Sequence, residues 1–221
     1  MGPESTVLFY SALVTQCQQQ YGATADEDYP EIYIYNLPIP DITTGTADKK
    51  ALSKILIAGA QKIETWGADM LTIPCNSVEL CFDEIKASIG IPCISMIEET
   101  VRSLNASGYT KIGLLGTNTT VQNNLYARYA NKYDIAITYP DNQLVIQKII
   151  WNILSGKKLL ADKKVLIETI DLFAKSGAEA VILGCTDLPI LINQSDTEIP
   201  LINSLEILAI LAISLANASV D

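Results

Sequence analysis

The strongest constraint on the fold is an internal repeat. Residues 67–77 read GADMLTIPCNS and residues 177–187 read GAEAVILGCTD, so glycine aligns with glycine, acid with acid and cysteine with cysteine at an offset of 110. Further along, the Ile-Pro pair at 91–92 aligns with the Ile-Pro pair at 199–200. A helix, a strand, a cysteine turn and an Ile-Pro strand therefore occur twice, which predicts two similar structural units.

Helix-like and strand-like segments alternate along both halves of the chain. Continuous apolar runs at residues 71–73 and 180–183 are typical of strands buried in a parallel sheet. We therefore expect an α/β fold of two pseudo-symmetric domains with mainly parallel sheets. The first domain is expected to contain residues 1–107 plus 206–221, with the C-terminal helix packing back on it, and the second residues 108–205. Residues 31–36, rich in β-branched and aromatic side chains, are expected to form a further strand.

The repeat places one cysteine at the end of a buried strand in each half. Ligands of open parallel sheets bind beyond the carboxyl ends of the strands, so Cys75 and Cys185 are expected to face each other across an interdomain cleft. A buried packing role is the alternative, but a position at a polar turn favours a reactive thiol. The remaining cysteines are expected to be packing residues: Cys17, Cys81 and Cys93.

The chain of 221 residues contains no histidine. This removes Ser-His-Asp and Cys-His triads and histidine-based zinc sites, so proton transfer must come from Cys, Asp, Glu, Lys or Tyr. A net charge of −10 argues against a nucleic-acid partner, and no apolar run approaches the roughly 18 residues of a membrane span. Five cysteines without a CxxC pair suit a reducing compartment, so we expect a cytoplasmic protein.

Two facing thiols suit racemisation or epimerisation. A helix N-terminus is expected to lower the pKa of a cysteine from about 8.5, so that a thiolate removes a proton from one face of a carbon and a thiol returns one to the other. The carbanion or enediolate needs fixed donors, for which Asn76, Ser77 and Thr186 are candidates beside backbone N–H groups. The same two cysteines could instead form a disulfide, although a duplicated cleft is an odd place for one.

These motifs resemble those of a known family. Pro-Cys-Asn-Ser at 74–77 and Gly-Cys-Thr-Asp-Leu-Pro at 184–189 resemble the paired cysteine motifs of the aspartate/glutamate racemase family. Residues 1–6 and 36–41 resemble its first two loops, and residues 113–120 the loop that opens the second domain. The resemblance covers essentially the whole chain and is closest to aspartate racemases. It implies two Rossmann-like domains, catalysis without cofactor or metal, an amino-acid substrate and a homodimer.

The resemblance also implies roles for individual residues. Cys75 and Cys185 would be the two bases of a PLP-independent amino-acid racemase. Met1, in the first loop, is a further candidate for the site. Glu79, where relatives often have His, is another candidate for the site. An exposed charge on a helix is an equally good interpretation of Glu79. The substrate's α-carboxylate and amino group would be held by Asn76, Ser77, Thr117, Thr120 and Thr186.

The sequence departs from the family pattern at three places. The family has a β-strand before the Met-Gly-Pro loop, so either the upstream residues are absent from this sequence or the first domain is unusual. Aspartate racemases have Arg where Ile42 stands, and the family has Lys where we align Leu154. Lys157 and Lys158 are close by but are expected to be solvated loop charges. Without both cations, the usual contacts for a dicarboxylic substrate are unfilled, which leaves the substrate open and admits a less acidic or larger amino acid than aspartate.

Two other functions fit the same residues. One is another isomerase of the superfamily, such as a hydantoin racemase or a maleate isomerase; an arylmalonate decarboxylase needs only one cysteine and is therefore disfavoured. The other is a catalytically silent homologue that binds a small ligand, which the missing cations motivate.

Overall fold

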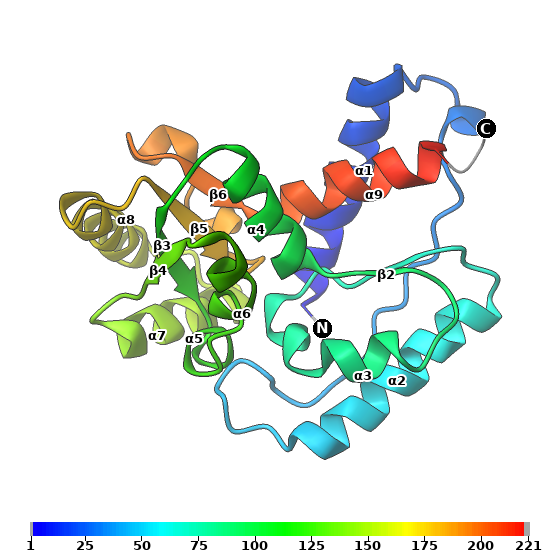
Figure 1. Ribbon diagram of the computed structural model, residues 1–221, viewed down its shortest axis with the longest axis horizontal. Helices are drawn as coiled ribbons and strands as arrows, with labels where there is room; N and C mark the ends of the chain where they lie inside the picture. The colour runs from blue at the N-terminus through cyan, green and yellow to red at the C-terminus, as the bar shows by residue number, and fades with distance from the viewer. Residues whose placement is uncertain (1, 219–221) are drawn as a thin grey trace.

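The computed structural model describes residues 2–218, which form an α/β structure with two parallel sheets (Figure 1). The first sheet pairs β1 (Leu71–Thr72) with β2 (Cys93–Ile94). The second sheet has the strand order β4-β3-β5-β6, and every pair is parallel. Its strands are β3 (Lys111–Gly116), β4 (Ala136–Thr138), β5 (Ala180–Gly184) and β6 (Leu201–Asn203). The predicted fold class is confirmed.

The two sheets repeat one another in register. The backbone N–H of Leu71 in β1 donates to the carbonyl of Pro92 at 2.8 Å, and the N–H of Val181 in β5 donates to the carbonyl of Pro200 at 2.9 Å. Leu71 and Val181 are related by the offset of 110 found in the sequence. The pairing of β1 with β2 is thus reproduced by the pairing of β5 with β6.

Helices connect and cover the strands, and several begin at residues whose side chains cap them. The Asp48 carboxylate accepts from the backbone N–H of Lys50 at 2.9 Å, and Ser95 Oγ accepts from the N–H of Glu98 at 3.0 Å. The α-helices are α1 (Pro3–Tyr21), α2 (Lys49–Thr65), α3 (Phe82–Lys86), α4 (Met96–Ala106), α5 (Asn118–Gln122), α6 (Ala127–Ala130), α7 (Gln143–Leu154), α8 (Leu160–Lys175) and α9 (Ser204–Ala218). Short 3₁₀ helices are η1 (Asp26–Asp28), η2 (Asn76–Cys81), η3 (Asn131–Tyr133), η4 (Leu188–Ile190) and η5 (Gln194–Asp196).

The second sheet is buried on both faces. Helices α7 and α8 cover one face, and α4 with the segment around Tyr126 covers the other. Close packing requires glycine in β3, because a Cβ on Gly113 would lie 2.6 Å from the ring of Phe173 in α8. The strands are therefore fixed from both sides, which fixes the turns that follow them.

The C-terminal helix returns to the first half of the chain. Helix α9 packs along α1, and its Leu208 and Ala212 share a core with Phe9 and Leu13 (Figure 1). Residues 219–221 lie outside the described residues, and the division into domains at 107/108 and 205/206 remains a prediction.

Two expected elements differ from the structure. Residues 31–36 are extended, but no strand of the described chain pairs with them, so the predicted strand is wrong. An isolated extended segment lacks the neighbour whose N–H and C=O groups would complete a ladder. The expected helix at 76–89 begins instead as η2 and becomes α-helical only in α3. No helix within residues 2–218 is both long and apolar enough to span a membrane.

Candidate active site

A cavity of about 260 Å³ lies beyond the carboxyl ends of the strands, between the two halves of the chain. Both halves supply its walls, because the turns after β1, β3 and β5 and the first turn of α1 all reach it. The structure places Cys75 and Cys185 in this one cavity. The polar residues that line it are Ser5, Asp41, Thr43, Asn76, Ser77, Thr117, Thr186 and Asp187.

Cys75 stands just before η2, where the extended chain after β1 turns into the helix. Its backbone is extended, with φ −155° and ψ 110°. Burial raises the pKa of the Cys75 thiol, and the negative charge of Asp187 raises it further. Hydrogen bonds from the backbone N–H groups of Val78 and Ser77 oppose this rise in pKa without cancelling it.

Cys185 directly follows β5 and is buried. Its thiol donates to Asp187 Oδ2 at 3.7 Å. Burial raises the pKa of Cys185 well above its ordinary value, and the charges of Asp187 and Cys75 add to the effect. The expectation that these thiols have lowered pKa values is therefore wrong, because desolvation and a neighbouring carboxylate outweigh the turn N–H groups.

A buried hydroxyl network ties Asp187 to the first helix. Ser5 Oγ donates to Asp187 Oδ1 at 2.5 Å, and Thr186 Oγ1 donates to Ser5 Oγ at 3.0 Å. Burial raises the pKa of Asp187, while the hydrogen bonds from Ser5 and Cys185 lower it. Asp187 also stands at the N-cap position of η4, but its side chain makes no capping bond there. Ser5 was not predicted as a site residue. The one sequence feature that could have indicated it is its position in the loop at residues 1–6, which resembles the first loop of the family.

The amide of Asn76 is held by residues on both sides. Tyr126 O–H donates to Asn76 Oδ1 at 2.6 Å, and Asn76 Nδ2 donates to Ser204 Oγ at 3.2 Å. Ser204 in turn donates to the carbonyl of Leu183 in β5 at 3.1 Å. Asn76 therefore has a fixed orientation at the cavity wall and joins the cysteine turn of the first half to the second sheet.

A second chain of hydroxyls crosses between the halves. Ser77 Oγ and Thr117 Oγ1 are hydrogen-bonded at 2.8 Å, and Thr117 Oγ1 and Thr120 Oγ1 at 3.0 Å. Ser77 and Thr117 line the cavity, whereas Thr120 lies behind the wall and is fully buried. The hydroxyl of Thr117 is thus oriented from both sides.

Glu79 does not line the cavity. Its carboxylate is buried and accepts a hydrogen bond from Ser95 Oγ at 2.7 Å. Burial raises the pKa of Glu79 to about 7. The expectation of an exposed helix charge is therefore wrong, and the side chain supports the start of α4 instead. Met1, the other additional candidate, lies outside the described residues.

Part of the cavity lining is apolar. Ile39, Ile42 and Leu154 belong to this part, so the two positions aligned with family cations do reach the site. The charged residues among the described lining residues are Asp41 and Asp187, both acidic. Lys158 is a surface charge, as predicted, and its Nζ lies 3.9 Å from Oε1 of Glu4.

Substituting Asp187→Asn should lower the pKa of both cavity thiols. The carboxylate charge of Asp187 raises the pKa of Cys75 and of Cys185, and the amide removes that charge while keeping the shape. Alkylation by iodoacetamide at neutral pH should therefore be faster in the variant, and its midpoint should move to lower pH. Glu198→Gln is the matched control, because it changes a carboxylate outside the cavity lining in the same way. It should leave the pH dependence of alkylation unchanged. An unshifted profile in Asp187→Asn would mean that Asp187 does not control the thiols.

Comparisons with known proteins cover nearly the whole chain. The sequence model of the Asp/Glu/Hydantoin racemase family matches residues 1–212. The broad specificity amino-acid racemase RacX of Bacillus subtilis is 30% identical over 217 residues, which is 95% of this chain and 92% of that protein.

Solved structures agree with this assignment. An aspartate racemase from Picrophilus torridus superposes with a TM-score of 0.79 at 28% identity, over 98% of this chain and 91% of that one. An aspartate racemase homologue from Pyrococcus horikoshii gives a TM-score of 0.80 at 27% identity, over 97% of this chain and 95% of that one. By sequence, by fold and by the cysteine turns that meet in its cavity, the chain belongs to the Asp/Glu/hydantoin racemase family.

Proposed function

We propose that this protein is a cofactor-independent amino-acid racemase that inverts Cα by two-base proton transfer between Cys75 and Cys185. The observation that carries the proposal is that each half of the chain supplies one thiol to the same cavity. The family and the similarity to an amino-acid racemase over 95% of the chain support the reaction type.

In this mechanism one cysteine acts as a thiolate and the other as a thiol. The thiolate takes the α-proton and becomes a thiol, and the opposite thiol gives its proton to the other face of Cα and becomes the thiolate. The substrate is inverted and one thiolate remains, so the charges balance. Both thiols have raised pKa values, and the ammonium group of a bound amino acid would favour the thiolate by its positive charge.

The hydroxyls at the cavity wall supply the expected substrate contacts. Ser77, Thr117 and Thr186 line the cavity and would bind the α-carboxylate and amino group together with the turn N–H groups. Asn76 also lines the cavity, with its amide oriented by Tyr126. Thr120, which contacts Thr117 from behind the wall, would act as a positioning residue.

The apolar residues in the cavity lining favour amino acids without a second carboxylate. A side-chain carboxylate placed beside Ile42 and Leu154 would meet no cation among the described lining residues, and Asp41 would repel it. We therefore propose a substrate with a neutral side chain. A cytoplasmic location and a homodimer are further proposals, based on composition and on the family resemblance.

The test is a panel of enantiopure amino acids incubated with the protein in deuterated water, followed by chiral chromatography and mass spectrometry. We expect inversion accompanied by α-deuterium for neutral amino acids, with less for aspartate and glutamate. A thermal-shift screen on the same panel separates the alternatives. Binding without exchange would indicate the silent ligand-binding homologue, and turnover of hydantoins or maleate but not of amino acids would indicate another isomerase.

A further inference from the structure

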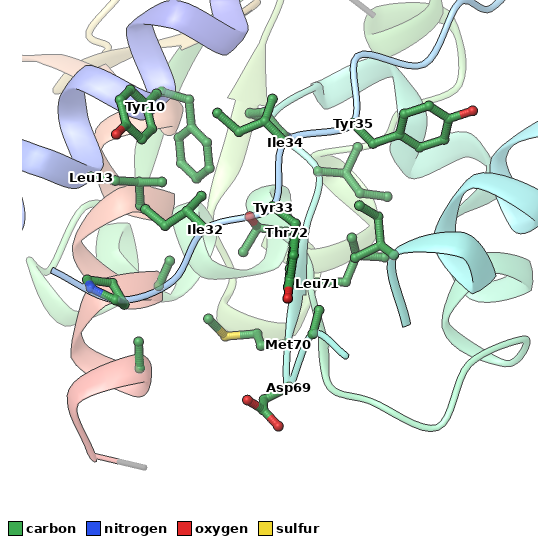
Figure 2. A pocket seen from close by; sticks show the side chains of 18 of the residues that line it. Tyr10, Leu13, Ile32, Tyr33, Ile34, Tyr35, Asp69, Met70, Leu71 and Thr72 are labelled. Carbon is green, nitrogen blue, oxygen red and sulfur yellow. The ribbon is translucent and has the colours of Figure 1, made fainter. Parts of the chain in front are cut away.

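One loop of the first half lies on the second half and lines the active-site cavity. This cavity loop contains residues 39–46, and its residues 39–43 line the cavity. In Figure 1 it is the light-blue loop ahead of α2 that reaches α5. The segment before it, residues 30–37, runs along a larger cavity of about 680 Å³ (Figure 2), and no strand within residues 2–218 pairs with residues 31–36. A sheet does not fix the cavity loop, so its position depends on the contacts that it makes itself.

The cavity loop is ordered internally by Asp41. Its Oδ1 accepts from the backbone N–H of Thr43 at 2.9 Å and from the hydroxyl of Thr43 at 2.8 Å, and its Oδ2 accepts from the hydroxyl of Thr44 at 2.9 Å. The single proton of the Thr43 hydroxyl is thus used within the loop, which leaves the lone pairs of Oγ1 for a partner outside it. The loop therefore presents a hydrogen-bond acceptor to the second half.

Gln147 on α7 supplies the matching donor. Its side chain is buried, its Nε2 donates to Thr43 Oγ1 at 3.2 Å, and its Oε1 accepts from the backbone N–H of Asn118 at 2.7 Å. A backbone N–H can only donate, so the amide oxygen must face Asn118 and the amide nitrogen must face Thr43. The orientation of the Gln147 amide is therefore fixed from both ends.

The Gln147 amide joins two walls of the active-site cavity. Its oxygen holds the turn that carries Thr117, and its nitrogen holds the loop that carries Ile42. Two contacts from Thr119 run beside this bridge, because its hydroxyl donates to the carbonyl of Ile42 and its backbone N–H donates to the carbonyl of Thr43 at 3.3 Å. Together these contacts hold Ile42 at the cavity, where it is buried.

From this geometry we propose that Gln147 is a positioning residue of the active site, which latches the cavity loop onto the second half and so sets the wall that meets the substrate side chain. Gln147 lies outside the cavity lining and acts through Thr43 and the turn before α5. The latch itself is a contact between the two halves of the chain, whereas its effect on a substrate rests on the proposed function. A loosened loop weakens binding at Ile42 and leaves both cysteines in place, so KM should change more than kcat.

Gln147→Glu tests one half of the latch. An ionised carboxylate keeps an acceptor for the Asn118 N–H, but it has no proton for Thr43 Oγ1 and adds a negative charge beside a loop that contains Asp41. Thr43→Val removes the same bond from the loop side without a change in charge, so it serves as the second variant if Gln147→Glu does not fold. In both variants NMR hydrogen exchange should be about fivefold faster at the Thr119 amide, whose acceptor is in the loop, and unchanged at the Asn118 amide.

Racemisation measures the effect of the latch on the substrate. In both variants KM for leucine should rise about fivefold, with kcat within about twofold of that of the unaltered protein. KM for alanine should rise less, because a methyl group makes less contact with the loop wall than an isobutyl group does. Gln61→Glu is the matched control, since it replaces an exposed amide on α2 that donates to the carbonyl of Ser88 at 3.2 Å. It should change neither the exchange of the Thr119 amide nor KM.

The measurements separate a failure of the latch from a failure of the proposed function. Unchanged exchange at the Thr119 amide in both variants would overturn the latch. Faster exchange with KM unchanged for both amino acids would overturn its role in substrate binding. If the unaltered protein racemised no amino acid, the proposed function would fail, and the latch would still be decided by exchange and by alkylation. Iodoacetamide should then alkylate the cavity thiols faster in Thr43→Val at every pH, with an unshifted midpoint, and unchanged exchange and alkylation would overturn the latch as well.

Discussion

Replacing Cys75 or Cys185 with serine should lower racemisation by about 10³-fold or more in both directions, because a serine hydroxyl is far less acidic than a thiol and one acid–base partner is lost. Inversion needs both faces of Cα, so either substitution should stop the reaction starting from either enantiomer. The measurement is chiral chromatography of the initial rates with the best substrate of the panel, starting separately from the L and the D form.

The two variants should differ in α-proton exchange. Each retains one thiol, which can still remove and return a proton on its own face of Cα. In deuterated water each variant should therefore label one enantiomer without inverting it, and the two variants should label opposite enantiomers. Cys17→Ala, a change in the buried face of α1 outside the cavity, is the matched control and should keep the activity. Full racemisation by either serine variant would contradict the two-base assignment.

The parts of the site that were predictable from sequence are those that local pattern encodes. The strands around Leu71 and Val181 are apolar runs that end at a turn, and their repetition places Cys75 and Cys185 at equivalent positions. Parallel strands that end on the same edge bring such turns together. The meeting of the two cysteines in one cavity therefore follows from periodicity and the repeat.

Other features depend on contacts between distant segments. Ser5 meets Asp187 across 182 positions of sequence, and neither residue has a local pattern that indicates the other. The direction of the thiol pKa shifts depends on this same arrangement, because burial and the Asp187 charge exceed the effect of the turn N–H groups. Residues 31–36 have strong strand propensity, yet a strand needs a partner, and the described chain gives them none.

Substrate selectivity should respond to a cation placed at an apolar position of the cavity lining. Leu154 lines the cavity and is 40% exposed, so a lysine there can reach the site without burying its charge. Leu154→Lys should shift the ratio of kcat/KM for glutamate over a neutral amino acid by roughly tenfold to a hundredfold towards glutamate. Adding Ile42→Arg should increase the shift, since an arginine can bind a carboxylate bidentately.

The matched control places the same charge elsewhere on the protein. Leu160→Lys, at an 84% exposed position at the start of α8 and outside the cavity lining, changes the net charge equally and should leave the selectivity unchanged. If Leu154→Lys and Leu160→Lys altered the ratio equally, the effect would be a long-range one of net charge. If neither altered it while racemisation persisted, the substrate side chain would point away from Ile42 and Leu154. The specificity assignment would then fail while the two-cysteine mechanism stood.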